Sequence, residues 1–256
     1  MTAAGEWGIW IVLYFWLAAM GGGAFLIALG LRDERAKRSG AFLAFLGIVI
    51  GALLLVIDLG QPARFWHLLA GFHPVSVMWL GSVVLALAGV GLFLLLVLRE
   101  WPGWLVWVTA VLVLLVVGYT GVLLMATARP FWSASPLMPW IFLASAYTTG
   151  SALLVLLGNH EPQLRRVSLN FAVVEAVLVV AHLIWVYPQA TEAIRAMLTG
   201  ELAWAFWGFA ILGVLLPVIM ELQRRAEALA AVLVLLGGFL LRYFIVYAGQ
   251  VGVLRF

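Results

Sequence analysis

Residues 76–98 read SVMWLGSVVLALAGVGLFLLLVL, a run without a single charged side chain. About 20 apolar residues suffice for a helix to cross a bilayer, so this run predicts a transmembrane helix. Seven other runs have a similar length and composition, and hydrophobic residues make up 66% of the 256-residue chain. The expected spans are about 7–31, 40–59, 76–98, 104–127, 138–158, 168–187, 202–221 and 229–250. The sequence therefore predicts an all-α integral membrane protein with eight transmembrane helices.

The composition excludes several classes of site. The chain has no cysteine, which rules out disulfides, thiolate metal ligands and cysteine-ligated iron–sulfur clusters within it. A haem held by two histidines is not expected, because only His182 of the four histidines falls in a span. Apart from Glu175 and His182, no two potential metal ligands share a helix face, so no metal is expected. The net charge of +3 comes from scattered arginines rather than a basic domain, so nucleic-acid binding is not expected either.

Basic residues are distributed unevenly over the connections between spans. One set of alternate connections carries nine lysines and arginines, and the other set carries four. Because cytoplasmic loops hold the excess of basic residues, we expect residues 32–39 in the cytoplasm and both termini outside a prokaryotic inner membrane. The three longest connections, 60–75, 128–137 and 188–201, then lie on the outer face. Long connections are commonly functional, so we interpret them as a docking or ligand surface.

The two halves of the chain show a weak internal similarity. An offset of 127 residues aligns Phe15 with Phe142, Ala19 with Ala146 and Gly23 with Gly150. An offset of four spans preserves the direction of each helix, so the repeat is expected to be parallel. We therefore expect two four-helix bundles side by side, one formed by residues 1–130 and the other by residues 131–256.

Four ionisable residues fall within the expected spans: Asp58, Glu175, His182 and Arg242. Each costs about 2.5 to 3.5 kcal/mol on insertion scales, so such residues face a bundle interior and indicate function by default. Glu175 and His182 lie seven residues apart, on one face of a helix. Together with Arg242 they predict a proton path in the second bundle. A buried ion pair that only stabilises this bundle is the alternative interpretation.

The most distinctive stretch is DLGQPARFWHLLAGFHPVSVMW, residues 58–79. Its glycine and proline residues end one helix, and Ser76 predicts the start of the next. Between them lie Asp58, Arg64 and His67, at the outer membrane surface. A histidine both takes and gives protons near neutral pH, so these residues are candidates for proton transfer. The alternative is an ion pair between Asp58 and Arg64 that only shapes the turn.

Two tyrosines lie at the same depth in the first bundle. Tyr14 and Tyr119 are each expected about 11 Å below the outer surface, given the rise of 1.5 Å per helical residue. Gly118 and Gly121 flank Tyr119, and they leave room for close helix packing or for a flat ligand. Tyrosines at this depth also occur simply as interfacial anchors.

The 58–81 stretch resembles the loop between the second and third helices in membrane subunits of the polysulfide reductase and NrfD family. The glycines of the first span, Tyr119 before Gly121, and the sequence Arg-Pro-Phe-Trp at 129–132 also resemble that family. The resemblance covers the first half of the chain well and the second half only by its number of spans.

The resemblance implies a quinone-reactive membrane anchor in a respiratory oxidoreductase. Menaquinone or ubiquinone is expected in the first bundle, with Tyr14 and Tyr119 as its contacts. Some relatives have a histidine where this chain has Tyr14. An iron–sulfur subunit is expected to dock on the outer face and to connect this subunit with a molybdopterin catalytic subunit. The chain itself is expected to hold no haem and no metal.

Two other functions fit parts of the sequence. A proton-coupled secondary transporter or channel is suggested by the even number of spans and by Glu175, His182 and Arg242. A purely structural membrane anchor is the third possibility. It would tolerate the loss of Tyr119 and Asp58 without losing electron transfer, whereas the quinone-reactive subunit would not.

Overall fold

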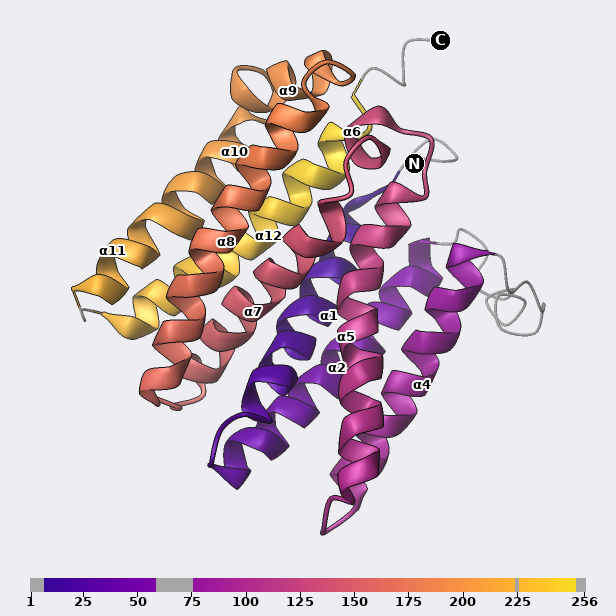
Figure 1. The fold of residues 1–256 in the computed structure, drawn as a ribbon, viewed down its shortest axis with the longest axis vertical. Helices are drawn as coiled ribbons and strands as arrows, with labels where there is room; N and C mark the ends of the chain where they lie inside the picture. The colour runs from indigo at the N-terminus through magenta and orange to yellow at the C-terminus, as the bar shows by residue number, and fades with distance from the viewer. Residues whose placement is uncertain (1–6, 59–75, 224–225, 252–256) are drawn as a thin grey trace.

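The computed structural model describes residues 7–58, 76–223 and 226–251 (Figure 1). These residues form helices and no strand, and eight of the helical stretches are long and apolar enough to cross a membrane. Seven spans are single helices: α1 (Ile9–Ala28), α2 (Glu34–Asp58), α4 (Val77–Val97), α5 (Gly103–Met125), α7 (Met138–Leu156), α8 (Pro162–Val186) and α12 (Glu227–Ala248). The remaining span joins α10 (Ala203–Gly208), a π-helical segment η2 (Phe209–Leu215) and α11 (Leu216–Leu222).

Two spans begin six residues earlier than the hydrophobic runs predict. Helix α2 starts at Glu34 because the Asp33 side chain accepts a hydrogen bond of 2.9 Å from the Arg35 backbone N–H. Helix α8 starts at Pro162, whose fixed φ and missing N–H suit a first helical turn. The expected cap of α4 is confirmed, since the Ser76 side chain accepts from the Trp79 backbone N–H. Hydrophobicity marks where a helix enters the bilayer, not where it begins.

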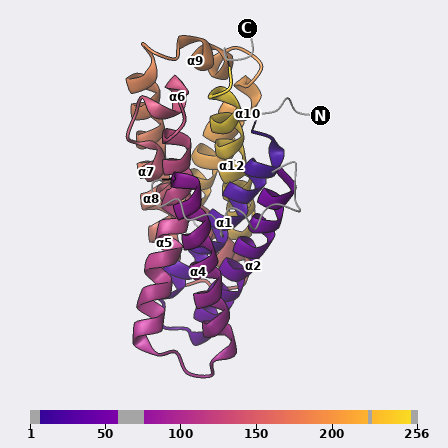
Figure 2. The ribbon, with the colours of Figure 1, turned by 90° about the vertical axis from the view of Figure 1, so that its right-hand side faces the viewer.

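Two short helices lie in the expected long connections. They are α6 (Pro130–Ser133) and α9 (Thr191–Leu198), and α9 buries Ala193, Ile194 and Met197. Figures 1 and 2 show both at the end of the molecule where α1 begins and α12 ends. The connection 60–75 falls outside the described residues.

Helix α1 occupies a central position. It packs most extensively against α2 and α7, while α7 also contacts α5, α8 and α12. In Figure 1, α2, α4 and α5 lie on one side of the α1–α7 contact, and α8, α10, α11 and α12 lie on the other. Most of the charged and polar side chains that are fully buried gather around α7 and α12.

Residues that the internal similarity aligns meet each other where α1 crosses α7. The rings of Phe15 and Phe142 are 5.7 Å apart and perpendicular, and Ala19 and Ala146 share one buried cluster. A Cβ atom added to Gly150 would overlap the backbone of Gly23 and Ala24. Contacts between equivalent positions are typical of an interface with two-fold symmetry.

The close contact between α1 and α7 predicts that a larger residue at Gly150 destabilises the protein. Gly150→Ala should lower the melting temperature of the purified protein by roughly 2 to 12 °C, because overpacking costs about 1 to 3 kcal/mol. Gly118→Ala is the matched control, since the nearest atoms to its added Cβ belong to the Leu143 side chain at 3.7 Å or more. Equal melting temperatures for the two variants would show that the α1–α7 contact is looser than described.

Candidate functional site

The two predicted tyrosines come together between the first four long helices. Tyr14 of α1 is only 2% exposed and packs against Gly51 of α2. Tyr119 of α5 is half-buried, and its hydroxyl end lies against Gly81 of α4, where any Cβ atom would overlap it. The two side chains are close enough to interact electrostatically. The site thus contains one half-buried tyrosine and one buried tyrosine.

Of the two roles expected for the glycines beside Tyr119, the structure supports close helix packing. A Cβ atom added to Gly121 would overlap the backbone of Met138 and Pro139 at the start of α7. Gly118 faces the side chain of Leu143. Both glycines therefore serve the packing of α5 on α7 and do not keep a slot open for a flat ligand. The glycine that accommodates the Tyr119 hydroxyl is Gly81, which sequence reasoning missed.

The proposed proton-transfer residues are only partly described. Asp58 is the last residue of α2 and is half-buried. Arg64 and His67 lie outside the described residues. The alternative between a proton route and an ion pair with Asp58 therefore stays as the sequence leaves it.

Side chains of the short helix α6 contact residues near the start of α1 and near the end of α12. Trp132 is fully buried, and its indole N–H donates a hydrogen bond of 2.7 Å to the carbonyl of Ile245. Its ring lies 5.1 Å from that of Trp7 and 5.1 Å from the guanidinium carbon of Arg129. Gln250 exchanges two hydrogen bonds with the Trp7 backbone, at 2.8 and 2.9 Å. These residues stabilise the fold at this end, and Trp132 is not available to a docking partner.

The second polar centre surrounds α7. Glu175, His182 and Arg242 are 4%, 2% and 0% exposed. Among the ion pairs of the described residues there is none between Glu175 and Arg242. Two hydroxyls of α7 lie between them instead: Thr148 donates to Glu175 at 2.9 Å, and Ser145 accepts from Arg242 at 2.9 Å. The expected pairing of the sixth and eighth spans is therefore indirect, because α7 separates them.

The carbonyls of Phe15 and Gly238 and the ring of Phe142 also contact the Arg242 side chain. Its Nε donates to the carbonyl of Phe15 at 3.1 Å, and Nη1 also donates to the carbonyl of Gly238 at 2.7 Å. The guanidinium carbon lies 5.4 Å from the centre of the Phe142 ring. Nη2 is buried without a hydrogen-bond partner among the described residues. Arg242 thus connects α12 to the α1 backbone at the residue next to Tyr14.

His182 lies two helical turns from Glu175 on the same face of α8. Its ring packs edge to face against Phe131 of α6, with centroids 5.2 Å apart. It lies beside the Phe131 backbone, but neither ring nitrogen makes a hydrogen bond of good geometry to the part of the chain that the structure describes. Within the described residues, no group of three potential ligands is arranged to hold a metal ion.

Comparison with known proteins gives a consistent result over the whole chain. A family model described as polysulfide reductase matches residues 1–256. A polysulfide reductase chain of Wolinella succinogenes is 33% identical, over 94% of this chain and 93% of its own length. Protein NrfD of Escherichia coli is 28% identical over 96% of both chains. A selenate reductase subunit of Mesobacillus selenatarsenatis is 34% identical over 30% of this chain and 20% of its own length.

Proposed function

This chain belongs to the polysulfide reductase (NrfD) family, and from that premise we propose that it is the quinone-reactive membrane subunit of a respiratory reductase complex. It is a multi-pass protein of the prokaryotic inner membrane. Its role is to exchange electrons between the menaquinone or ubiquinone pool and an iron–sulfur partner. The observation that carries this proposal is the tyrosine pair, a half-buried Tyr119 and a buried Tyr14.

A quinone site needs an apolar surface and hydrogen-bond donors for the two carbonyl oxygens. In this proposal the Tyr119 hydroxyl donates to one quinone carbonyl, and Tyr14 is the second phenol within the same group of helices. Reduction or oxidation also requires two protons to reach or leave these oxygens. Asp58, together with Arg64 and His67, is the proposed route for them to the outer face.

We propose that the two halves of the chain form two bundles with different roles. Residues 1–130 form the quinone-binding bundle and residues 131–256 form a second bundle. Support comes from the contacts of Phe15 with Phe142 and of Gly23 with Gly150, which a two-fold relation between the halves would produce.

The partner is proposed to be an iron–sulfur subunit that links this chain to a molybdopterin catalytic subunit. Two relatives are named as one component of a polysulfide reductase and of a selenate reductase, which supports membership in such a complex. The end of the molecule that carries α6 and α9 is the proposed docking face (Figure 2). We place that face outside the cytoplasm, because the opposite connections hold most of the basic residues.

Photo-crosslinking tests the partner and the docking face together. A crosslinking residue at Ser133 of α6 or at Glu192 of α9 should capture a protein with several four-cysteine ferredoxin motifs, because both positions are exposed on the docking face. Arg99, exposed in the α4–α5 connection, is the control position and should not capture it. Capture from Arg99 alone would contradict the docking face. Absence of any iron–sulfur protein from all crosslinks and from the purified complex would favour the transporter.

A further inference from the structure

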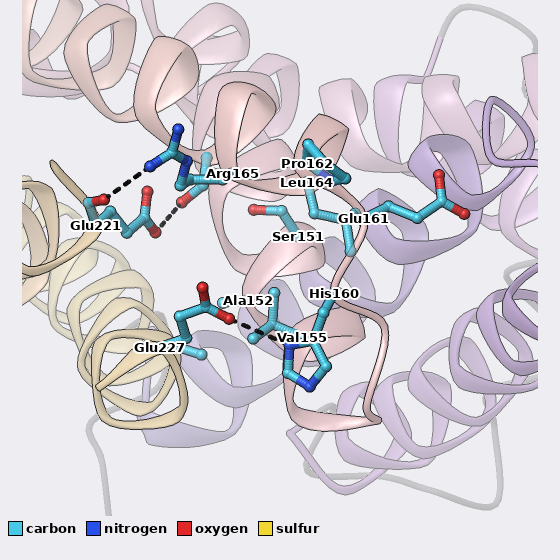
Figure 3. Close-up of a pocket in the computed structure, with 12 residues that line it drawn as sticks. Ser151, Ala152, Val155, His160, Glu161, Pro162, Leu164, Arg165, Glu221 and Glu227 are labelled. Carbon is cyan, nitrogen blue, oxygen red and sulfur yellow. Dashed lines mark hydrogen bonds and ion pairs between the residues drawn. The ribbon is translucent and has the colours of Figure 1, made fainter. Parts of the chain in front are cut away.

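A cavity of about 230 Å³ lies between α7, α8, α11 and α12, at the end opposite α6 and α9 (Figure 3). His160 and Glu227 form an ion pair of 3.2 Å at its rim, and their side chains are 61% and 50% exposed, so water reaches this position. The polar residues that line the cavity include Ser151, His160, Arg165, Ser168, Glu221 and Glu227. Such a lining holds water, whereas an apolar cavity would stay dry.

Glu221 connects the two walls of this cavity. One carboxylate oxygen accepts a hydrogen bond of 2.7 Å from the Ser168 hydroxyl, and its carbonyl accepts one of 3.3 Å from Arg165. The other carboxylate oxygen is buried and has no hydrogen-bond partner among the described residues. A buried carboxylate oxygen without a partner is costly, so water is its expected partner.

The cavity approaches Glu175 along α7. Ser151 lines the cavity and donates 2.8 Å to the carbonyl of Thr148, one helical turn further into the membrane. The Thr148 hydroxyl in turn donates 2.9 Å to the Glu175 carboxylate. Three helical residues correspond to a rise of about 4.5 Å, so Thr148, which contacts Glu175, lies about one turn beyond the cavity lining.

The facing helix α8 carries a matching polar stripe. Ser168, Glu175 and His182 follow one another at seven-residue intervals, and all three are buried. Seven residues make two turns, so the three side chains share one face at steps of about 10.5 Å. Ionisable residues inside a span mark ion or proton pathways by default. The stripe begins at the cavity and ends where His182 meets Phe131.

Arg242 is the charged group that faces Glu175 from α12. Arginine keeps its proton in proteins, and the carbonyls of Phe15 and Gly238 fix this side chain. It therefore acts as a stationary counter-charge and not as a carrier. This differs from the path expected from the sequence, in which Arg242 was a member of the line.

We propose that the cavity is a proton entrance, through which Glu175 exchanges its proton with water on the face opposite α6 and α9. The Thr148 hydroxyl gives its proton to the Glu175 carboxylate and takes one from cavity water, and the reverse transfer returns a proton to the cavity. The inference is independent of the quinone assignment, because the exchange needs no redox partner.

Carbodiimide labelling tests this exchange. Dicyclohexylcarbodiimide modifies protonated carboxyl groups in apolar surroundings, and mass spectrometry identifies the modified peptide. The intact complex is labelled in right-side-out and inside-out membrane vesicles, with the pH of one side held constant. Lowering the pH on the cavity side from 8 to 6 should raise labelling of Glu175 at least threefold, whereas the same change on the other side should leave it unchanged. Glu175→Gln is the specificity control and should lose the labelled peptide.

Two further variants test the route from the cavity to Glu175. Thr148→Val preserves the side-chain shape but removes the hydroxyl, and it should weaken the response of labelling to cavity-side pH. Because the chain has no cysteine, Ser168→Cys introduces a single thiol, which should react with a membrane-impermeant methanethiosulfonate from the cavity side. Val177→Cys, on the lipid-facing side of α8 and 61% exposed, is the matched control and should react from neither side.

The contradicting outcomes are distinct. Labelling of Glu175 that ignores the cavity-side pH, or that follows the pH of the other side, overturns the entrance. Protection of Glu175 by sodium ions without any response to pH would mean that the cavity leads to a cation site, which also overturns it. A Ser168→Cys thiol that does not react from the cavity side would show that water does not enter.

Discussion

Tyr119→Phe is expected to lower quinol turnover by roughly 5- to 150-fold while the complex stays assembled. In the proposed site the phenol hydroxyl donates to a quinone carbonyl, and loss of one such donor commonly costs about 1 to 3 kcal/mol. The ring itself is retained, so its contact with Gly81 and the packing of α4 on α5 are preserved. Turnover is measured as quinol oxidation by membranes that contain equal amounts of the complex.

Variants of the neighbouring residues separate chemistry from packing. Gly81→Ala should reproduce the loss of turnover, because its added Cβ would displace the Tyr119 hydroxyl. Gly89→Ala, on the same helix, is its control, since the nearest atom is a methyl of Ile48 at 3.7 Å. Unchanged quinol oxidation and quinone binding in both Tyr119→Phe and Tyr14→Phe would refute this site. The quinone would then have to be sought in the second half, around His182.

Arg242→Met is expected to prevent accumulation of the folded subunit. The substitution removes hydrogen bonds to Phe15, Gly238 and Ser145 and leaves Glu175 without its counter-charge. Removal of one partner from a buried charge arrangement costs about 3 to 5 kcal/mol, a large part of a typical stability of about 5 to 15 kcal/mol. The amount of subunit in washed membranes, measured by immunoblotting, checks this expectation.

Adding Glu175→Gln tests whether the uncompensated carboxylate causes the loss of the subunit. Arg242→Met combined with Glu175→Gln should restore part of the lost subunit, because the amide needs no counter-charge and can still accept the hydrogen bond from Thr148. Glu175→Gln alone should accumulate better than Arg242→Met, because the carbonyls of Phe15 and Gly238 still accept hydrogen bonds from the arginine. Normal accumulation of the single Arg242→Met variant would mean that the charge arrangement does not stabilise the fold.

The positions of the spans were predictable from the sequence because a bilayer imposes both length and composition on a crossing helix. The early starts of α2 and α8 were not, because Asp33 and Pro162 set them through capping geometry and not through hydrophobicity. Helices α6 and α9 are short, and α6 packs on α5 while α9 packs on α10 and α12, neighbours that the sequence does not state.

The sequence predicts the depth of the candidate site but not its neighbours. Counting the helical rise predicts Tyr14 and Tyr119 at one level, and this depth stays a prediction. The sequence does not state which helices are adjacent, so it left both helix packing and a ligand slot open for Gly118 and Gly121, which face α7. The same lack of adjacency concealed Gly81, and it concealed the α7 hydroxyls between Glu175 and Arg242.

Photolabelling of the purified complex with an azidoquinone locates the quinone most directly. Probes of the ubiquinone and menaquinone types are both used, and unlabelled quinone is added as the competitor. The expected result is competed labelling of peptides from α4 and α5 that include Gly81 or Tyr119, with loss of this label in Tyr119→Phe. Competed labelling confined to peptides of α7, α8 or α12 would contradict a quinone site at the tyrosine pair.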